Sequence, residues 1–242
     1  MLALTQLALA ADKVDADPAK VEAGVAAIEA AEDKAAVDAA LAAAIADLEP
    51  EVVACPSEKF ADVPVKGNWA HEGIDYCIAN DYMNGVSDTA FSPNSTVTRA
   101  QLVTILYRVA GEPEVTTSGT FSDVAAGLWY SDAIEWAAAE GVVLGVGEGK
   151  FSPNGEITRE QIATILYRYT GEPEVEGDLK TFPDEAKVSD YAYDALIWAT
   201  KAGLITGIES KGVTRLAPQE NATRAQIAAI IMRWQGGSYK CD

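Results

Sequence analysis

The chain has 242 residues, of which 49% are hydrophobic and 23% are charged, a composition typical of a folded domain. Its formal net charge of −19 argues against a nucleic-acid partner, because the phosphate backbone requires a basic surface. No apolar run reaches the ~18–20 residues that span a bilayer, so we expect no membrane insertion. Any acidic ligand must be held by local cations, since charges further away than ~8 Å are largely screened.

The first fifty residues differ in composition from the rest: 19 are alanine and none is aromatic. Two apolar stripes at helical spacing predict two or three short helices, arranged as a hairpin. The stripes consist of Val21, Val25 and Ile28, and of Val37, Leu41, Ile45 and Leu48. We interpret residues 1–55 as an Ala-rich helical spacer or as the tail of a neighbouring domain.

Residues Met1–Ala11 have an alternative interpretation as a signal peptide that ends at Ala-Leu-Ala. The segment lacks a basic n-region, and Thr5-Gln6 interrupts its short apolar stretch, so the spacer interpretation is preferred. If the protein acts outside the cell, we expect this chain to be a fragment of a longer one.

The rest of the chain consists of three copies of one unit. Phe60, Phe121 and Phe182 lie 61 residues apart, and each begins a Phe-x-Asp loop. The Thr-Arg motifs recur after 60 and then 65 residues, which places an insertion of about five residues in the third copy. Because a fixed period with loop-sized insertions is typical of repeat proteins, we divide the chain into copies at 56–117, 118–178 and 179–242.

Each copy contains two predicted helices with a glycine turn between them. The first helix opens at an aromatic residue, Trp69, Trp129 or Tyr191, and the turns lie at Gly85, Gly145 and Gly207. Gly141 and Gly203, with Asp81 in the first copy, occupy the position after the first helix that requires left-handed backbone. Trp136, Trp198 and Trp234 lie on apolar stripes and are predicted core residues.

One helix pair is too small to bury its own apolar face, so the copies must pack on one another. The predicted fold class is all-α: three helix-loop-helix repeats packed as a pseudo-threefold body, preceded by the Ala-rich helical segment.

The second helix of each copy begins with a capping box. Thr98, Thr158 and Thr223 are each followed three residues later by Gln101, Gln161 and Gln226, which is the Thr-x-x-Gln pattern of a helix N-terminus. The residue between them, Arg99, Arg159 or Arg224, is not required for capping, and a cation there opposes the helix dipole. A salt bridge within the fold is one explanation. Three such arginines in register favour another, a site for a carboxylate, which an arginine fork binds well beside exposed helix N–H groups.

These motifs, in all three copies and in the same order, resemble the S-layer homology domain family over about residues 57–236. The resemblance implies a non-catalytic module that attaches a larger bacterial surface protein to secondary cell-wall polysaccharide, outside the cell. It also implies grooves between the units that bind a sugar with a ketal-linked pyruvate, with Arg99, Arg159 and Arg224 as carboxylate contacts. The chain departs from the family pattern at Gln101, Gln161 and Gln226, where glutamate is usual, and in the third copy at Tyr191 and Leu216.

Further candidate ligand-binding residues each have a structural alternative. Trp69 and Trp129 can stack on a sugar face or pack in the core. Asp62, Asp123 and Asp184 can accept sugar hydroxyls or cap backbone amides, and the second reading is favoured. The glycine turns fix the backbone, but they also allow a ligand to approach closely. The alternative function, from another class, is a structural or self-assembly module that binds protein partners.

No catalytic motif is present, and we expect neither an enzyme nor a cofactor. The three cysteines form no CxxC pair and have no histidine at ligand spacing, so we expect no metal site. His71, the only histidine, is predicted on the exposed side of its helix. Cys77 is a predicted buried free thiol, whereas Cys55 and Cys241, which flank the repeats, are candidates for a disulfide.

Overall fold

The computed structural model describes residues 18–31, 33–48 and 54–241, so the question of a signal peptide at Met1–Ala11 lies outside the described residues. The chain divides into two compact units, residues 1–54 with 241–242 and residues 55–240. Within the described ranges, no helix combines the length and the apolar character needed to cross a membrane.

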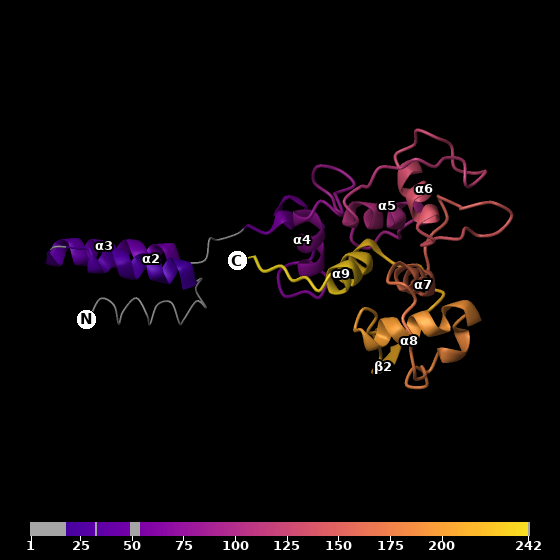
Figure 1. Cartoon of the computed structure of the whole chain (residues 1–242). Helices are drawn as coiled ribbons and strands as arrows, with labels where there is room; N and C mark the ends of the chain where they lie inside the picture. Colours follow the sequence, from indigo (N-terminus) through magenta and orange to yellow (C-terminus); the bar gives the residue numbers. More distant parts are fainter. Residues whose placement is uncertain (1–17, 32, 49–53, 242) are drawn as a thin grey trace. The chain divides into compact units, whose positions relative to one another are not determined.

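The described residues of the first unit form two helices, α2 (Pro18–Glu29) and α3 (Lys34–Leu48), which pack against each other (Figure 1). The side chain of Asp33 accepts a hydrogen bond from the Ala36 N–H at 2.8 Å and so caps the start of α3. The two helices predicted from the apolar stripes are confirmed. The third possible helix would fall on residues that are not described.

The second unit contains three pairs of helices, one pair for each predicted copy (Figure 1). The pairs are α4 (His71–Ala79) with α5 (Arg99–Val109), α6 (Ser131–Ala139) with α7 (Arg159–Tyr169), and α8 (Tyr193–Lys201) with α9 (Arg224–Trp234). Short 3₁₀ turns lie at η1 (Pro56–Lys59), η2 (Glu185–Lys187) and η3 (Asp190–Ala192).

The helix starts are partly corrected by the structure. The first helix of each copy begins two residues after Trp69, Trp129 or Tyr191, so these aromatic residues lie in the preceding turn and not in the helix. The second helices begin as predicted. Each has a complete capping box, in which the threonine hydroxyl accepts from the N3 amide and the glutamine side chain accepts from the N-cap amide.

Helices from different copies pack in a cyclic order: α5 contacts α6, α7 contacts α8, and α9 contacts α4. The backbone repeats this order at the centre of the unit. Val97 N–H donates to Ala222, Ala222 N–H donates to Ile157, and Ile157 N–H donates to Val97, at 2.9–3.1 Å. All three side chains are buried, so this closed ring of hydrogen bonds lies in the hydrophobic core.

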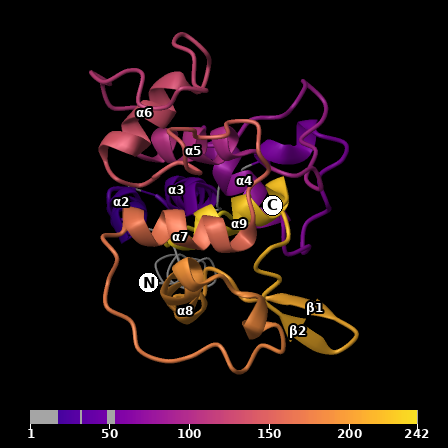
Figure 2. The ribbon, with the colours of Figure 1, turned by 90° about the vertical axis from the view of Figure 1, so that its right-hand side faces the viewer.

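The third copy corrects the expectation of an all-α fold. Its inserted residues form a two-stranded antiparallel hairpin, β1 (Ile208–Ser210) and β2 (Val213–Arg215), which Figure 2 shows side by side. The two loop residues, Lys211 and Gly212, both have positive φ, as a type I′ turn requires. The unit is therefore mostly helical, with one small sheet.

The predicted core residues are largely confirmed. Trp136 is buried between the rings of Tyr107 and Tyr169, with centroid distances of 5.6 Å to each. Trp198 and Trp234 are half-buried against the same core. Gly141, Gly203 and Asp81 have the positive φ that the sequence predicted after the first helices.

The cysteines behave as the sequence indicated. Cys77 is a buried free thiol whose sulfur lies 3.6 Å from the Ala228 carbonyl, and burial raises its pKa to about 12. Cys55 and Cys241 are each disulfide-bonded.

Candidate functional site

The three motif arginines connect each copy to the next. Arg99, Arg159 and Arg224 occupy the first position of α5, α7 and α9, and only 4–8% of each residue is exposed. Each Nε–H donates to a backbone carbonyl of the following copy at 2.8 Å; the acceptors are Phe151, Leu216 and Phe91. The arginine that capping did not explain therefore has a structural role, as a bond between copies.

The outer ends of the guanidinium groups differ among the three arginines. In the described part of the chain, the Nη groups of Arg99 and Arg159 have no hydrogen-bond partner, whereas Arg224 Nη2 donates to the Asn84 carbonyl at 2.5 Å. Burial lowers the pKa of all three side chains below its ordinary value, although nearby groups, including Asp123 for Arg99 and Glu220 for Arg159, act to raise it. Arg99 and Arg159 each present a cation with unused donors, a combination that favours an anion.

One cavity of about 390 Å³ lies against Arg159. Its wall contains Gly207, Gln226 and Arg233 of the third copy and Trp69 of the first, whose side chain is largely exposed. The cavity therefore collects residues from all three copies.

A second cavity, of about 370 Å³, lies against Arg99. Gly145, Gln161 and Arg168 of the second copy line it, together with Tyr191 of the third. Equivalent residues line the two cavities: each residue at the first cavity comes from the copy that follows the one supplying its counterpart at the second. Each has a motif arginine, a glycine turn, a capping glutamine, a second arginine and an exposed aromatic ring. We call them the Arg159 groove and the Arg99 groove.

Seven predicted site residues line neither groove: Arg224, Gly85, Gln101, Trp129 and the three loop aspartates, Asp62, Asp123 and Asp184. Arg224 stacks over the ring of Phe91, 4.5 Å from its centroid, and its outer donor is occupied by Asn84. Trp129 is exposed and makes an edge contact with Tyr130 at 5.0 Å. The structure thus groups the predicted residues around two of the three arginines.

The aspartates of the Phe-x-Asp loops hold backbone amides. Asp62 accepts from Phe91 and Ser92, Asp123 from Phe151 and Ser152, and Asp184 from Leu216 and Ala217, at 2.7–2.9 Å. The second residue of each donor pair, Ser92, Ser152 or Ala217, has positive φ, so the carboxylate stabilises a strained turn. For Asp62 and Asp123, burial raises the pKa, but the amide hydrogen bonds outweigh it and hold the pKa below its ordinary value.

The glycine turns make room for the phenylalanines of the same copy. A Cβ on Gly85 would lie 2.3 Å from the Phe60 ring, and one on Gly145 would lie 2.7 Å from the Phe121 ring. At Gly207 the nearest atom would be Thr214 Cγ2, at 2.5 Å. These glycines are required for packing, whether or not a ligand also approaches them.

The glutamines have one polar group left for a ligand. In Gln161 and Gln226, Oε1 accepts from the N-cap amide at 3.3 and 3.1 Å, so the Nε2 group of each is a neutral donor on the groove wall, and that of Gln161 also lies against the Tyr191 hydroxyl. A glutamate here would add a negative charge beside the groove arginine. The glutamines therefore make both grooves more favourable for an anion.

Sequence reasoning missed the second arginine of each groove. Arg168 and Arg233, like Arg108 in the first copy, follow the motif arginine by nine residues, and this recurrence was visible in the sequence. It also missed the environment of Tyr191, whose hydroxyl donates to Glu160 at 3.1 Å. Glu160 is buried, and its position is alanine in the other two copies, so only the Arg99 groove has this contact.

Comparison with known proteins gives one match per copy to the S-layer homology domain, at residues 59–103, 120–163 and 181–228. An amylopullulanase of Thermoanaerobacterium thermosulfurigenes is 39% identical over 171 residues, which cover 69% of this chain and 9% of that protein. Exoglucanase XynX of Acetivibrio thermocellus is 36% identical over 76% of this chain and 17% of its own length. The surface-layer 125 kDa protein of Lysinibacillus sphaericus is 34% identical over 68% of this chain and 14% of its own length. The chain spans less than a fifth of each of these relatives.

Proposed function

The chain belongs to the S-layer homology domain family, and we propose that it is a non-catalytic module that anchors a larger surface protein to bacterial cell-wall polysaccharide outside the cell. The different names of the relatives support an anchoring role. Two carry the names of polysaccharide-degrading enzymes and one that of a surface-layer protein, yet all share this segment. A segment common to proteins with different activities favours a role in attachment rather than in catalysis.

The ligand that fits the grooves best is an acidic sugar that bears a carboxylate, such as a pyruvate ketal. The single observation that carries this proposal is the pair of free Nη groups on Arg99 and Arg159, each in a cavity beside an exposed aromatic ring. An arginine fork binds a carboxylate through two parallel hydrogen bonds, and an aromatic face packs on the apolar side of a sugar. The glutamine Nε2 adds a neutral donor.

We further infer that the three copies form a pseudo-threefold body in which two of the three equivalent grooves bind ligand. The cyclic helix contacts and the ring at Val97, Ile157 and Ala222 support the symmetry. The hydrogen bond from Arg224 to the Asn84 carbonyl supports the inference that the third groove does not bind, because it occupies a donor that a carboxylate would use.

Binding to isolated cell walls tests this function. The full chain is sedimented with bacterial wall sacculi that carry secondary polysaccharide, before and after mild acid treatment that removes ketals. We expect retention on untreated walls and its loss after acid treatment. Equal retention on both would exclude the ketal carboxylate as the ligand.

The alternative is a self-assembly module that binds protein partners, and exposed apolar residues beside the Arg99 groove, Leu144 and Val146, favour it. An array of acidic and neutral wall glycans separates the two functions. The anchoring module binds the acidic glycans, whereas the assembly module gives no glycan signal.

A further inference from the structure

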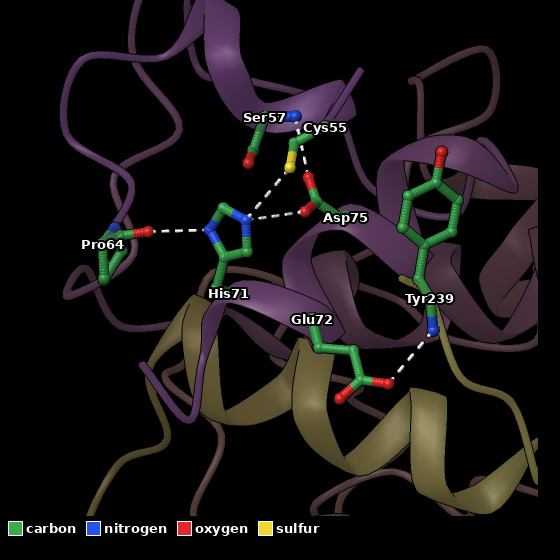
Figure 3. Close-up of polar contacts among 7 residues, drawn as sticks. All are labelled: Cys55, Ser57, Pro64, His71, Glu72, Asp75 and Tyr239. Atoms are coloured by element: carbon green, nitrogen blue, oxygen red, sulfur yellow. Dashed lines mark hydrogen bonds and ion pairs between the residues drawn. The ribbon is translucent and has the colours of Figure 1, made fainter. Parts of the chain in front are cut away.

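A cluster of side chains in the first copy has no part in the grooves. Figure 3 shows His71 at the start of α4 with its ring directed between Cys55 and Asp75. His71 Nε2 lies 3.4 Å from Cys55 Sγ and 3.1 Å from Asp75 Oδ2. The Asp75 side chain is fully buried and that of His71 is only 12% exposed, which corrects the predicted exposed position of the histidine. The fold thus brings together a cysteine sulfur, an imidazole and a carboxylate from three positions in the sequence.

The contacts of the cluster determine which nitrogen of His71 carries a hydrogen in the neutral ring. Nδ1 lies 2.8 Å from the Pro64 carbonyl, which can only accept, so Nδ1 carries a hydrogen and donates it. In the neutral ring, Nε2 then has a lone pair, and it faces a carboxylate oxygen that is also an acceptor. Two acceptors at 3.1 Å require a positive species between them, either a proton or a metal ion.

The same contacts exclude a catalytic triad. In a Cys-His-Asp triad the carboxylate holds the ring nitrogen opposite the one that faces the nucleophile. Here both the sulfur and the carboxylate lie against Nε2, while a backbone carbonyl occupies Nδ1. Convergence of several ligand atoms on one point is the arrangement of a metal site.

We propose that, when the disulfide of Cys55 is reduced, Cys55 Sγ, His71 Nε2 and Asp75 Oδ2 bind one zinc ion. The three ligand atoms lie within 4.8 Å of one another. Ligands held tetrahedrally at roughly 2.0–2.3 Å from zinc are about 3.2–3.8 Å apart, which is close to the observed separations of Nε2 from sulfur and oxygen. Zinc accepts this mixture of sulfur, nitrogen and oxygen, and its fourth position is left for water or a further ligand.

The outer contacts of the cluster also fit a metal site. Metal-binding histidines donate their other N–H to a carbonyl or carboxylate, as Nδ1 does to Pro64. The other oxygen of Asp75, Oδ1, accepts the Ser57 N–H at 2.8 Å, and this bond holds the carboxylate with Oδ2 toward His71 Nε2. The cluster is specific to the first copy: serine and tyrosine replace His71 in the other two, and glutamate and isoleucine replace Asp75. The repeat fold therefore does not require it.

In the structure Cys55 is disulfide-bonded, so the site is redox-dependent. A small dithiol transfers two electrons and two protons to the S–S bond, which breaks into two thiols as the dithiol becomes a cyclic disulfide. Zinc binding then displaces the proton of the Cys55 thiol and the proton shared by His71 and Asp75. A small disulfide reverses the sequence: it takes the two electrons and becomes two thiols, with protons from the protein thiol and from water, while the disulfide of Cys55 re-forms and the metal is released.

The experiment uses the full chain and Co²⁺ as a spectroscopic substitute for zinc. The chain is reduced with dithiothreitol, desalted without oxygen and titrated with Co²⁺. We expect a near-ultraviolet thiolate-to-cobalt band and visible bands of a four-coordinate ion, saturating at one Co²⁺ per chain and lost on addition of zinc. The oxidised chain should give none of these bands. Absence of the thiolate band from the reduced chain would overturn the proposal.

Variants assign the ligands. Cys55→Ser should abolish the thiolate band, and His71→Ala and Asp75→Asn should each weaken Co²⁺ binding at least tenfold. Asp75→Asn retains an oxygen that can accept the Ser57 N–H. Two matched controls should bind as the unaltered chain does. Cys77→Ala removes the buried cysteine that is a free thiol in the structure. Glu72→Gln alters a carboxylate that accepts from Tyr239 N–H at 3.2 Å (Figure 3). A band that survives in Cys55→Ser or disappears in Cys77→Ala would also overturn the assignment.

A stability measurement covers the case in which reduction loosens the fold. Zinc should raise the thermal midpoint of the reduced chain, or restore its helical circular dichroism if reduction has unfolded it, because a ligand that binds only the folded state stabilises it. It should leave the midpoint of the oxidised chain unchanged. An equal effect of zinc on both redox forms would contradict the proposed dependence on Cys55.

Discussion

At the scale of single residues, the motif arginines combine two roles in one side chain. The Nε of Arg159 bonds the Leu216 carbonyl of the next copy, while its Nη groups face the Arg159 groove. The bonds between copies thus explain the recurrence of an arginine at an unfavourable helix position, and the proposed ligand would give it a second role. A substitution there must be judged on stability and on binding together.

Replacing Arg159 with lysine keeps the charge but removes the fork. A lysine nitrogen cannot bond the Leu216 carbonyl and a carboxylate in the same geometry, so we expect the Arg159 groove to lose its ligand. Calorimetry with a short acidic oligosaccharide released from the wall should show the stoichiometry fall from two to one. The lost hydrogen bond should lower the free energy of unfolding by about 1–2 kcal/mol. Arg215→Lys is the matched control, because Arg215 pairs with Glu220 and lines neither groove. A stoichiometry of two in Arg159→Lys would contradict the assignment of the Arg159 groove.

The loop aspartates predict how stability depends on pH. The folded-state pKa of Asp123 lies below its ordinary value, so the unfolded state binds more protons between the two values. The stabilisation is present above the ordinary pKa and is lost as the pH falls through the lowered one. Asp123→Asn should be less stable at pH 7 by about 1–3 kcal/mol, because one amide loses its acceptor. Its thermal midpoint should also fall less between pH 5 and pH 2 than that of Asp88→Asn, a control at an exposed position; parallel pH curves would show that Asp123 does not contribute.

At the scale of elements, the sequence predicted what local chemistry determines. The second helices, their capping boxes and the left-handed residues at Asp81, Gly141 and Gly203 follow from residue types at fixed positions. The hairpin β1–β2 was recognised only as an insertion, because a few residues with a Lys-Gly turn carry little periodic signal. Nor did spacing indicate that His71 meets Cys55, since a long-range contact of this kind depends on how the loop before α4 folds back.

The glycine turns allow packing and backbone strain to be separated. Gly145 and Gly127 both have φ near +78°, but a Cβ on Gly145 would lie 2.5 Å from the Lys150 carbonyl, whereas nothing lies within 4 Å of one on Gly127. Gly127→Ala should cost only the left-handed backbone, about 1 kcal/mol. Gly145→Ala should cost a further ~1–3 kcal/mol for overpacking against Phe121. Urea unfolding measures the free energy of unfolding of the two variants. Equal losses of stability would mean that the turn at Gly145 relaxes without disturbing the Phe121 ring.

At the scale of the whole molecule, the charge and the architecture have separate consequences. The net charge of −19 is of the same sign as that of the proposed ligand, an acidic wall polymer, so the proposed binding requires short-range attraction by the groove arginines. The three copies are joined cyclically, and the last helix, α9, packs on the first helix of the first copy, α4. A cyclic body has no copy that can be removed without exposing two interfaces, whereas the Ala-rich segment belongs to a separate compact unit.

Two truncations should therefore behave in opposite ways. A chain that begins at Ala54 retains Cys55, the capping boxes and both grooves, so it should unfold cooperatively and bind wall sacculi as the full chain does. A chain that ends at residue 178 lacks the helix that covers α4, the Ala222 member of the central ring and the acceptor of Arg159 Nε. It should lose the cooperative transition and the near-ultraviolet circular dichroism of packed aromatic rings, because the remaining pairs cannot bury their apolar faces. Denaturant unfolding monitored by tryptophan fluorescence measures both outcomes. Loss of cooperativity in the chain that begins at Ala54 would show that α2 and α3 contribute to the folding of the repeats, and the boundary near residue 55 would then be wrong.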